Sequence, residues 1–500
     1  MSQTPRVLVA NRGEIALRII RACHEEGLEA VAVYSDADRL SPHVRAADVA
    51  LPIGPPPPGE SYLRVDRLLE AARAGGATLV HPGYGFLAER AHFAAAVVGA
   101  GLTWVGPPAS AITAMGDKTE ARRRMQAAGV PIVPGLTLPI TEPAAAIGAA
   151  EEIGYPVLVK AAAGGGGKGM RVVHRAADLL PALETAASEA QKAFGDASVY
   201  LERYVERPRH VEIQVLADHE RTVHLGEREC SVQRRHQKLV EEAPSAAVAP
   251  ALRERMGAAA VAAAAAVGYR GAGTCEFLLA ADGSFYFLEM NTRIQVEHPV
   301  TELVYGVDLV REQLRIAQGQ PMRLPRGPLT PRGWALECRI TSEDPANGFL
   351  PSTGRIEYLR LPAGPGVRWD GGFEAGNEVT LFYDSLLGKV VVWAPDRAEA
   401  INRMRRALQE LVVTGVATNQ AFHLRLLDDP DFQRAAIDSQ FLDRRPDLLE
   451  GRPPAARIEA LAVAAALAEE EARLRRRPRV AEEGGRDTAW RDAGRREGLR

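Results

Sequence analysis

The 500-residue sequence has few cysteines and no motif that would join them. Cys23, Cys230, Cys275 and Cys338 lie far apart, and none belongs to a Cys-x-x-Cys pair. This spacing argues against a disulfide framework and against a cysteine-based zinc site. We therefore expect reduced cysteines that pack in the interior.

The sequence also lacks a long apolar segment and a large net charge. Its longest apolar run, residues 258–267, is well short of the roughly 18 residues of a membrane-spanning helix and is typical of a buried helix. The 61 Lys and Arg residues nearly balance the 64 Asp and Glu residues, so the net charge is −3. Because no export signal is visible either, we expect a cytoplasmic protein that binds neither nucleic acid nor membranes.

The length of the chain predicts several domains, because one hydrophobic core seldom organises 500 residues. The first residues read as strand, helix and strand, which predicts an α/β domain with a parallel sheet. Their turn, Asn11-Arg12-Gly13, lacks the GxGxxG pattern of dinucleotide-binding folds. Later short alternating runs predict an antiparallel sheet with a helix, and the Ala-, Glu- and Arg-rich end predicts a tail with one helix. The expected segments are 1–114, 115–330, 331–447 and 448–500.

Four consecutive glycines, Gly164 to Gly167, precede Lys168-Gly169 between two strand-like runs. They do not form a Walker A loop, since neither Ser or Thr after the lysine nor a following helix is present. Bare N–H groups in a glycine hairpin can close over phosphates, and Lys160 on the preceding strand would add a positive charge. The pattern predicts a mobile phosphate-binding flap, with a flexible surface hairpin as the alternative.

A second hairpin pattern brings two acidic side chains together. Asp282-Gly283 separates two apolar runs, and this dipeptide is typical of a two-residue hairpin loop. Counting back along both strands from that loop places Glu276 opposite Glu289. Like charges in an apolar hairpin favour a divalent cation between them, most plainly Mg²⁺, and Asn291 on the same face could add an oxygen ligand. Two glutamates on a solvated face are the alternative.

Polar side chains continue beyond this expected metal site. If the chain stays extended until His298-Pro299, Arg293, Gln295 and Glu297 project to the same side as Asn291. The guanidinium and the amide can hold a small planar oxyanion, and the carboxylate can accept its proton. A structural salt-bridge ladder is the alternative.

Three strings resemble biotin carboxylases: GGGGKGM at 164–170, QRRHQKLVEEAP at 233–244 and EMNTRIQVEHPVTE at 289–302. The resemblance runs from about residue 7 to residue 442. It implies an α/β and α+β multidomain fold. This fold comprises an N-terminal Rossmann-like pre-ATP-grasp domain, an ATP-grasp domain with a mobile glycine-rich lid at about 131–204, and a C-terminal biotin carboxylase domain.

The resemblance also implies a role for individual residues. Mg²⁺ or Mn²⁺ would be held by Glu276, Glu289 and Asn291. Bicarbonate would be held by Lys238, Arg293, Gln295 and the Val296 backbone, with Glu297 as the base. Arg339 would bind biotin and stabilise its enolate-like oxygen. The residues implied for ATP are Lys118, Lys160, Gly165, Gly166, Gly167, Met170, Glu202, His210, Gln233, His236, Glu276, Leu278 and Glu289.

The implied reaction uses ATP and bicarbonate to form carboxyphosphate and then to carboxylate biotin. No methionine of the chain is followed by lysine, so the usual biotin-attachment signature is missing. We therefore expect biotin on a separate biotin carboxyl carrier protein, with carboxyltransferase subunits as further partners and a homodimer by resemblance. Acetyl-CoA is the first expected acceptor, and propionyl-CoA, methylcrotonyl-CoA and pyruvate are alternatives.

Two other functions remain open from the sequence. Another ATP-grasp ligase would keep the acidic pair and the flap but would not need Arg293, Glu297 and Arg339 together. A catalytically silent nucleotide-binding protein is the other, although the intact acidic and basic residues argue against it.

Overall fold

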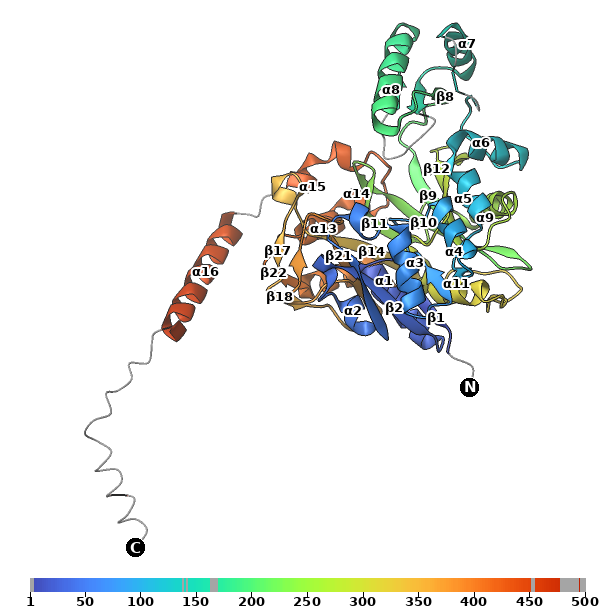
Figure 1. The fold of residues 1–500 in the computed structure, drawn as a ribbon. Coiled ribbons are helices and arrows are strands. Elements are labelled where there is room, and N and C mark those ends of the chain that lie inside the picture. Colours follow the sequence, from blue (N-terminus) through green and yellow to red (C-terminus); the bar gives the residue numbers. More distant parts are fainter. Residues whose placement is uncertain are drawn as a thin grey trace. The chain divides into compact units, whose positions relative to one another are not determined.

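A computed structural model describes residues 4–136, 139–140, 143–161, 170–450, 455–476 and 494. The chain divides into two compact units, Met1–Glu450 and Gly451–Arg500. Every sheet formed by the described residues belongs to the first unit, and the second unit contributes helix α16 (Ala455–Arg476) (Figure 1). The glycine flap at 164–169, with Gly165, Gly166 and Gly167, lies outside the described residues.

The N-terminal sheet is parallel, with strand order β3-β2-β1-β4-β5. Val7 and Val9 of β1 pack in one core with α1, whereas Leu8 packs in a second core with α3 and α4. Because helices cover both faces, β1 is apolar at successive positions rather than at alternate ones. The strands are β1 (Arg6–Val9), β2 (Glu29–Ser35), β3 (Val49–Gly54), β4 (Leu79–His81) and β5 (Thr103–Trp104). The helices are α1 (Gly13–Glu25), α2 (Pro42–Ala46), α3 (Val65–Ala74), α4 (Ala91–Gly99) and α5 (Ala109–Gly116).

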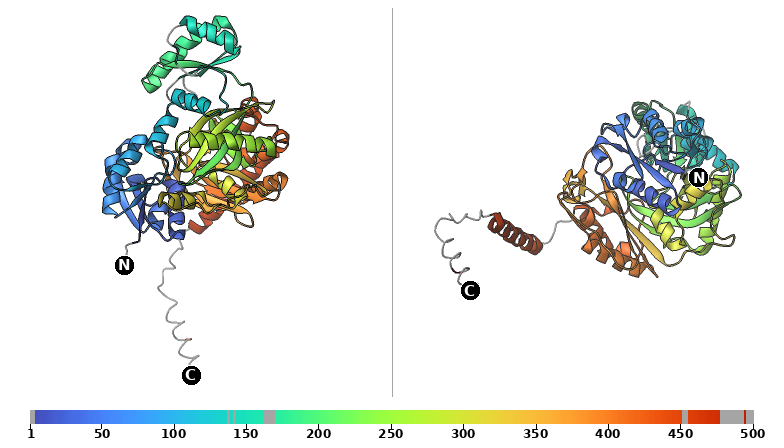
Figure 2. Two further views of the ribbon diagram at one scale, coloured as in Figure 1. Left: turned by 90° about the vertical axis from the view of Figure 1, so that its right-hand side faces the viewer. Right: turned by 60° about the horizontal axis from the view of Figure 1, so that its bottom comes forward.

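A small antiparallel sheet, β7-β6-β8, stands out from the rest of the first unit together with two helices (Figures 1 and 2). Its elements are α7 (Pro143–Ile153), β6 (Val157–Ala161), β7 (Met170–Val173), α8 (Leu179–Phe194) and β8 (Val199–Arg203). It follows α6 (Lys118–Ala127), where Asp117 caps the helix by accepting hydrogen bonds from the backbone N–H groups of Thr119 and Glu120. The flap residues join β6 to β7.

The largest sheet has eight antiparallel strands in the order β13-β12-β9-β10-β11-β14-β21-β19. They are β9 (Arg209–Ala217), β10 (Thr222–Arg234), β11 (Gln237–Ala243), β12 (Gly271–Leu279), β13 (Phe285–Asn291), β14 (Trp334–Thr341), β19 (Val367–Gly371) and β21 (Leu386–Ala394). Strands β11 and β14 pair directly, so sequence on both sides of residue 331 contributes to one sheet. Three short strand pairs are separate from it. They are β15 (Glu343–Asp344) with β16 (Leu350–Pro351), β17 (Gly354–Arg355) with β20 (Glu378–Val379), and β18 (Tyr358–Arg360) with β22 (Val412–Thr414).

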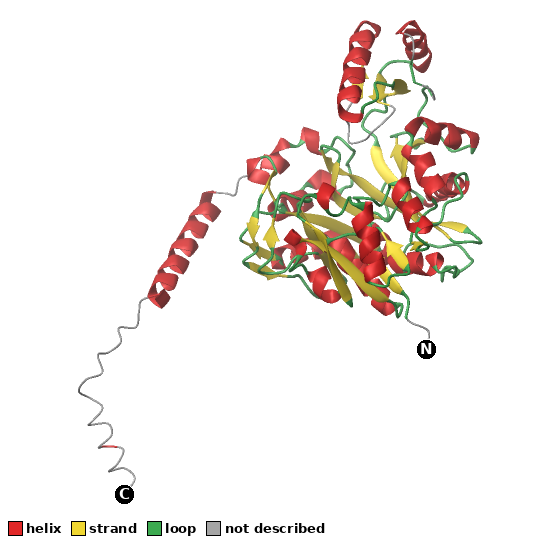
Figure 3. Cartoon of the chain, in the orientation of Figure 1, coloured by secondary structure: helices red, strands yellow, loops and turns green. Residues whose placement is uncertain are grey.

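Helices pack against this sheet (Figure 3). They are α9 (Pro250–Ala265), α10 (His298–Tyr305), α11 (Leu309–Ala317), α12 (Arg397–Glu410), α13 (Gln420–Asp428), α14 (Pro430–Gln433) and α15 (Pro446–Glu450). Helix α11 shares a core with α1 and β1 through Leu309 and Leu314, which ties the large sheet to the N-terminal one. None of the described helices is long and apolar enough to cross a membrane.

The acidic hairpin pairs Glu276 with Glu289, as expected, but by a different path. Leu279 pairs with Phe285, so the loop is longer than the two residues predicted from Asp282-Gly283. A β-bulge between the Phe277 and Glu276 pairs then shifts the register back. The longer loop and the bulge cancel, and the two carboxylates remain opposite each other.

The expectation of extended chain up to His298-Pro299 is wrong. Strand β13 ends at Asn291, residues 292–297 form bends and a turn, and His298 begins α10. Pro299 is in the first turn of that helix, where its missing N–H costs no hydrogen bond. The polar side chains are therefore brought together by a folded segment rather than by strand alternation.

Candidate active site

A cleft of about 800 Å³ lies in the first unit and is lined by residues from all three expected domains. Arg12, Tyr84 and Phe86 line it from the N-terminal segment, and Phe382 and Tyr383 from the C-terminal segment. The predicted site residues that line it are Lys118, Lys160, Met170, His210, Gln233, His236, Lys238, Glu276, Glu289, Asn291, Arg293, Gln295, Val296 and Arg339. Of the predicted residues that the structure describes, Glu202, Leu278 and Glu297 are not among those that line the cleft.

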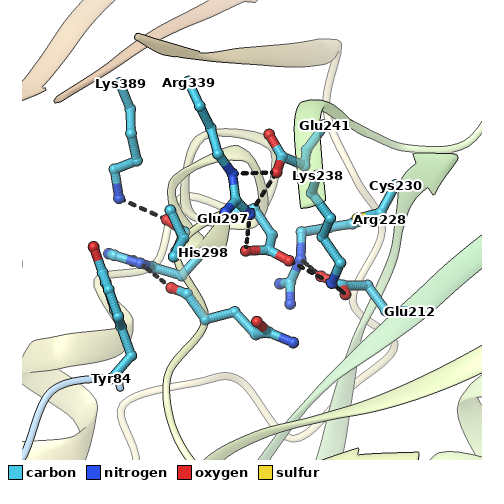
Figure 4. Close-up of polar contacts among 12 residues, drawn as sticks. Tyr84, Glu212, Arg228, Cys230, Lys238, Glu241, Glu297, His298, Arg339 and Lys389 are labelled. Atoms are coloured by element: carbon cyan, nitrogen blue, oxygen red, sulfur yellow. Dashed lines mark hydrogen bonds and ion pairs between the residues drawn. The ribbon is translucent and has the colours of Figure 1, made fainter. Parts of the chain in front are cut away.

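Lys238 is the centre of the charged groups in the cleft (Figure 4). Its Nζ donates to Glu212 Oε2 at 2.6 Å, to Glu276 Oε1 at 2.8 Å and to Glu297 Oε1 at 2.8 Å. All three ammonium protons are thus engaged. Burial opposes the charge, but the three carboxylates outweigh it and raise the pKa of Lys238 well above its usual value. Lys238 therefore stays a cation.

Glu297 is held between two cations. Its side chain is fully buried, with Oε1 bound to Lys238 and Oε2 accepting from Arg339 Nη2 at 2.9 Å. Burial alone would favour the protonated acid, but Lys238 and Arg339 hold the pKa of Glu297 well below its usual range. The group is a carboxylate and can accept a proton.

Arg339 is in turn fixed by Glu241 on the neighbouring strand β11. Arg339 Nε donates to Glu241 Oε1 at 2.6 Å, so the guanidinium is bound along one edge by Glu241 and Glu297 (Figure 4). Burial raises the pKa of Glu241 to about 7 even though Arg339 contacts it. The rest of the guanidinium lines the cleft.

Glu276 and Glu289 supply the hard oxygen atoms that a divalent cation requires. Glu276 is already bound, since Oε1 accepts from Asn291 Nδ2 at 2.9 Å and from Gln295 Nε2 at 3.0 Å, and Oε2 lies 3.0 Å from His210 Nε2. Glu289 is exposed in the cleft, yet the surrounding protein and the charge of Glu276 raise its pKa. A carboxylate disfavoured by a neighbouring carboxylate fits a site that Mg²⁺ or Mn²⁺ would complete.

Two other groups of possible ligands occur among the described residues. His210, Glu212 and Glu276 place ligand atoms within 4.8 Å of one another, as do Glu212, Cys230 and Glu297. The ammonium of Lys238 contacts both carboxylates in each group, which leaves less negative charge for a cation. In the Glu276–Glu289 pair it contacts Glu276 but not Glu289, so this pair remains the better cation site.

The expected nucleotide residues lie on several elements around the cleft. Lys118 begins α6, Lys160 is on β6, and His210 is on β9, where it pairs with Leu278 of β12. Gln233 and His236 belong to the β10–β11 hairpin. Burial and the charge of Lys160 lower the pKa of Lys118. Two neighbouring cations of this kind are suited to a polyphosphate.

Glu202 does not itself line the cleft but holds Lys160 in place. Lys160 Nζ donates to Glu202 Oε2 at 2.9 Å, and Arg122 Nη1 donates to the other oxygen at 2.5 Å. All three side chains are at least nine-tenths buried. Glu202 thus joins α6 to the small sheet and orients a lysine toward the expected phosphates.

Several residues of the site were not found from the sequence. Glu212 could have been, because His210, Glu212 and Gln214 alternate with apolar residues on β9 and so mark one polar face. Glu89 gave no such signal, yet its Oε2 accepts from Arg293 Nε at 2.8 Å from a turn 204 residues away in sequence. Others that contact predicted residues include Arg122, Glu241 and Lys389, and Arg228 binds Glu212.

Sequence families match most of the first unit. Residues 3–112 match the family described as biotin carboxylase, N-terminal domain, and residues 337–444 match biotin carboxylase C-terminal domain. Residues 117–324 match carbamoyl-phosphate synthase L chain, ATP binding domain.

Two curated relatives illustrate the similarity. The chain is 52% identical to a pyruvate carboxylase subunit of Methanothermobacter thermautotrophicus, across 88% of this chain and 89% of that one. It is 50% identical to biotin carboxylase 1 of Bacillus subtilis, across 88% of this chain and 98% of that one.

Solved structures agree over the same region. The biotin carboxylase domain dimer of Hydrogenobacter thermophilus 2-oxoglutarate carboxylase, a complex with MgADP, ADP and bicarbonate, is 45% identical and superimposes with a TM-score of 0.85, over 91% of this chain and all of that one. Biotin carboxylase of Campylobacter jejuni is 44% identical with a TM-score of 0.85, over 88% of this chain and 99% of that one. The expected three-part architecture is confirmed, and the chain belongs to the biotin carboxylase family of ATP-dependent carboxylases.

Proposed function

We propose that this chain uses ATP and bicarbonate to carboxylate biotin carried on a separate carrier protein, as the first half-reaction of acetyl-CoA carboxylase. The observation that supports this most directly is the position of Glu297, a buried carboxylate held between Lys238 and Arg339 beside the cleft. Bicarbonate activation and biotin binding together require a base, a fixed ammonium and a guanidinium close to one another.

Bicarbonate would bind against Lys238, Arg293, Gln295 and the Val296 backbone. Glu297 would take its proton while a bicarbonate oxygen attacks the γ-phosphorus of ATP and the bond to ADP breaks. The products of that step are ADP and carboxyphosphate. Carboxyphosphate then breaks down to CO₂ and phosphate, the phosphate removes the ureido proton of biotin, and the ureido nitrogen attacks CO₂. Arg339 would stabilise the negative charge on the ureido oxygen.

ATP would lie along the residues that begin at α6 and end on the acidic hairpin. These are Lys118, Lys160, Met170, Glu202, His210, Gln233, His236, Glu276, Leu278 and Glu289, with Gly165, Gly166 and Gly167 outside the described residues. Lys118 and Lys160 would neutralise charge on the phosphates, which is the main task in phosphoryl transfer. Glu276, Glu289 and Asn291 would hold Mg²⁺ or Mn²⁺, which when bound offsets the charge of the phosphate oxygens.

The final acceptor has a second candidate. The relative that is 52% identical is named as part of pyruvate carboxylase, so pyruvate is the alternative to acetyl-CoA. We further propose a cytoplasmic homodimer that works with a biotin carboxyl carrier protein and carboxyltransferase subunits. The dimer rests on the dimeric domain of the Hydrogenobacter protein.

The test is ADP release by the purified chain with Mg²⁺, ATP and bicarbonate, with and without free biotin. We expect turnover to depend on bicarbonate, to rise with biotin, and to fall about 10²- to 10⁴-fold in Glu297→Gln, which cannot accept the proton. A nucleotide-binding assay on the same variant serves as the control and should give unchanged ATP affinity. ATP binding without any effect of bicarbonate or biotin would instead favour another ligase or a silent nucleotide-binding protein.

A further inference from the structure

Lys389 is a fully buried lysine close to the site whose role no motif explains. It lies on β21 with a side-chain exposure of 0%, and its Nζ donates to the backbone oxygen of Val296 at 2.6 Å. Figure 4 shows it beside Arg339, reaching toward the segment that carries Glu297 and His298. Placing an ammonium away from water is costly unless its bonds are worth more than the lost hydration.

The two partners of Lys389, Val296 and Glu14, come from distant parts of the chain. Glu14 of α1 lies 3.1 Å from Nζ, and Glu14 also accepts a hydrogen bond from Tyr84 Oη at 2.5 Å. Tyr84 and Val296 both line the cleft. Lys389 therefore connects these two lining residues through the buried Glu14 side chain.

The backbone at Glu14 is closely packed. A Cβ atom on Gly372 would lie 2.5 Å from the backbone nitrogen of Glu14, so the chain at residue 372 packs directly against the start of α1. The ammonium of Lys389 thus has the Glu14 carboxyl group as one partner and the Val296 carbonyl as the other.

Val296 precedes the base in a turn, and the side chain of that base, Glu297, is held by Lys238 and Arg339. Gln295 O accepts from the His298 side chain through Nδ1 at 2.8 Å, and the next carbonyl, that of Val296, is the one that Lys389 binds. This carbonyl is part of the Val296–Glu297 peptide, so Lys389 contacts that peptide directly. Rotating that peptide would move both the Val296 backbone and the Glu297 carboxylate.

We propose that Lys389 is a positioning residue, which fixes the Val296–Glu297 peptide so that bicarbonate meets its backbone contact and its base together. This inference rests on the proposed function. Lys389 touches neither reacting group, so it acts only through the geometry of that turn and through the Glu14–Tyr84 contact.

The remaining charges near Lys389 do not change this assignment. Glu337, on the neighbouring strand β14, is buried, and within the described part of the chain neither of its oxygens has a hydrogen-bond partner. Burial raises the pKa of Glu337 well above its usual value, against the charge of Lys389. Asp370 is paired with Arg368, which leaves Glu14 as the acidic side chain in direct contact with Lys389.

The experiment compares Lys389→Met with a double variant, Lys389→Met with Glu14→Gln. The single variant removes the donor to Val296 but leaves the Glu14 carboxylate without its cation. The double variant removes both charges, while Gln keeps an acceptor for Tyr84. Both are measured for the KM of bicarbonate in ADP release and for the Kd of a non-hydrolysable ATP analogue.

We expect the KM of bicarbonate to rise about tenfold or more in both variants, as the loss of one charged hydrogen bond would cause. The Kd of the ATP analogue should stay within about twofold. Recovery of the original KM in the double variant would overturn the proposal, because Lys389 would then only balance Glu14. Failure of both variants to fold would overturn it too, since the lysine would serve stability alone. Absence of bicarbonate-dependent turnover in the unaltered chain would instead overturn the proposed function itself.

Discussion

Lys238 and Glu297 stay charged at the centre of the cleft because each contacts more than one group of opposite charge. Lys238 donates to three carboxylates, and Glu297 accepts from Lys238 and Arg339. Carboxyl groups with fewer such contacts behave differently. Burial raises the pKa of Glu241, which accepts from Arg339, to about 7, and it raises the pKa of Glu337, which has no hydrogen-bond partner among the described residues, well above its usual value. Partner geometry, rather than residue type, therefore decides which of these glutamates can act as a base.

A buried histidine next to Arg339 predicts how stability depends on pH. His423 is fully buried and its Nε2 lies 2.7 Å from the backbone oxygen of Arg339. Burial lowers the pKa of His423 to about 4, whereas an unfolded histidine titrates near 6.5. Between these pH values the unfolded chain binds a proton at His423 that the folded chain does not bind. The free energy of unfolding thus keeps the full contribution of the neutral imidazole above about pH 6.5, and it falls by about 3 kcal/mol as the pH drops toward 4.

This prediction is checked by urea unfolding at pH 7 and at pH 5 for the unaltered chain and for His423→Gln. Other buried histidines and carboxylates contribute their own pH dependence, which both proteins share. The free energy of unfolding should fall less in the variant than in the unaltered chain over this range. Equal losses in the two proteins would show that His423 does not carry the effect.

At the scale of elements, the acidic hairpin shows what sequence can and cannot predict. The Glu276–Glu289 pair was predictable because strand alternation and the hairpin signal are local. The longer loop and the bulge were not, since no residue near Asp282-Gly283 marks them. The end of β13 at Asn291 was missed for a related reason, because polar residues at alternate positions look the same in a strand and in a folded segment.

The acidic pair predicts that Glu289→Gln weakens metal binding without lowering thermal stability. The variant loses one of two carboxylate ligands, so we expect the apparent affinity for Mg²⁺ in ADP release to fall about tenfold or more. In EDTA the Tm should not fall, because the substitution removes the carboxylate that the surrounding protein and the charge of Glu276 disfavour. Mg²⁺ titration of ADP release and thermal unfolding in EDTA measure the two effects.

Glu343→Gln is the matched control for this prediction. Glu343 also lines the cleft, but its carboxylate accepts from the hydroxyls of Thr341 and Ser385 rather than facing Glu276. The control should keep the Mg²⁺ dependence of the unaltered chain. If both variants changed it equally, the metal would have to be assigned elsewhere in the cleft.

Across the whole molecule, the fold class followed from local patterns, whereas the joining of the parts did not. The parallel N-terminal sheet was predictable from the β-α-β pattern, and the strands after residue 331 from their alternation. The pairing of β11 with β14 could not be predicted, because no pattern in either strand indicates which strand it pairs with, and the two are almost a hundred residues apart. The domain boundaries near 114, 330 and 447 stay a prediction.

The division into two units predicts that the first unit is stable without the second. Leu448, in α15, is 5% exposed and packs in the core with Phe422 and Phe432, and its backbone oxygen accepts from Arg425. By contrast, Val463 and Leu467 of α16 are 61% and 66% exposed, so they contribute little burial.

A chain that ends at residue 450 should therefore keep the Tm and the rate of ADP release of the full chain. A chain that ends at residue 444 removes Leu448 from the core and should lose about 2–5 kcal/mol of stability, as the loss of a buried leucine does. Thermal unfolding and ADP release on the three lengths distinguish the cases. A lower Tm for the chain ending at 450 would mean that residues 451–500 stabilise the catalytic unit, and a selective loss of turnover would give them a part in the reaction.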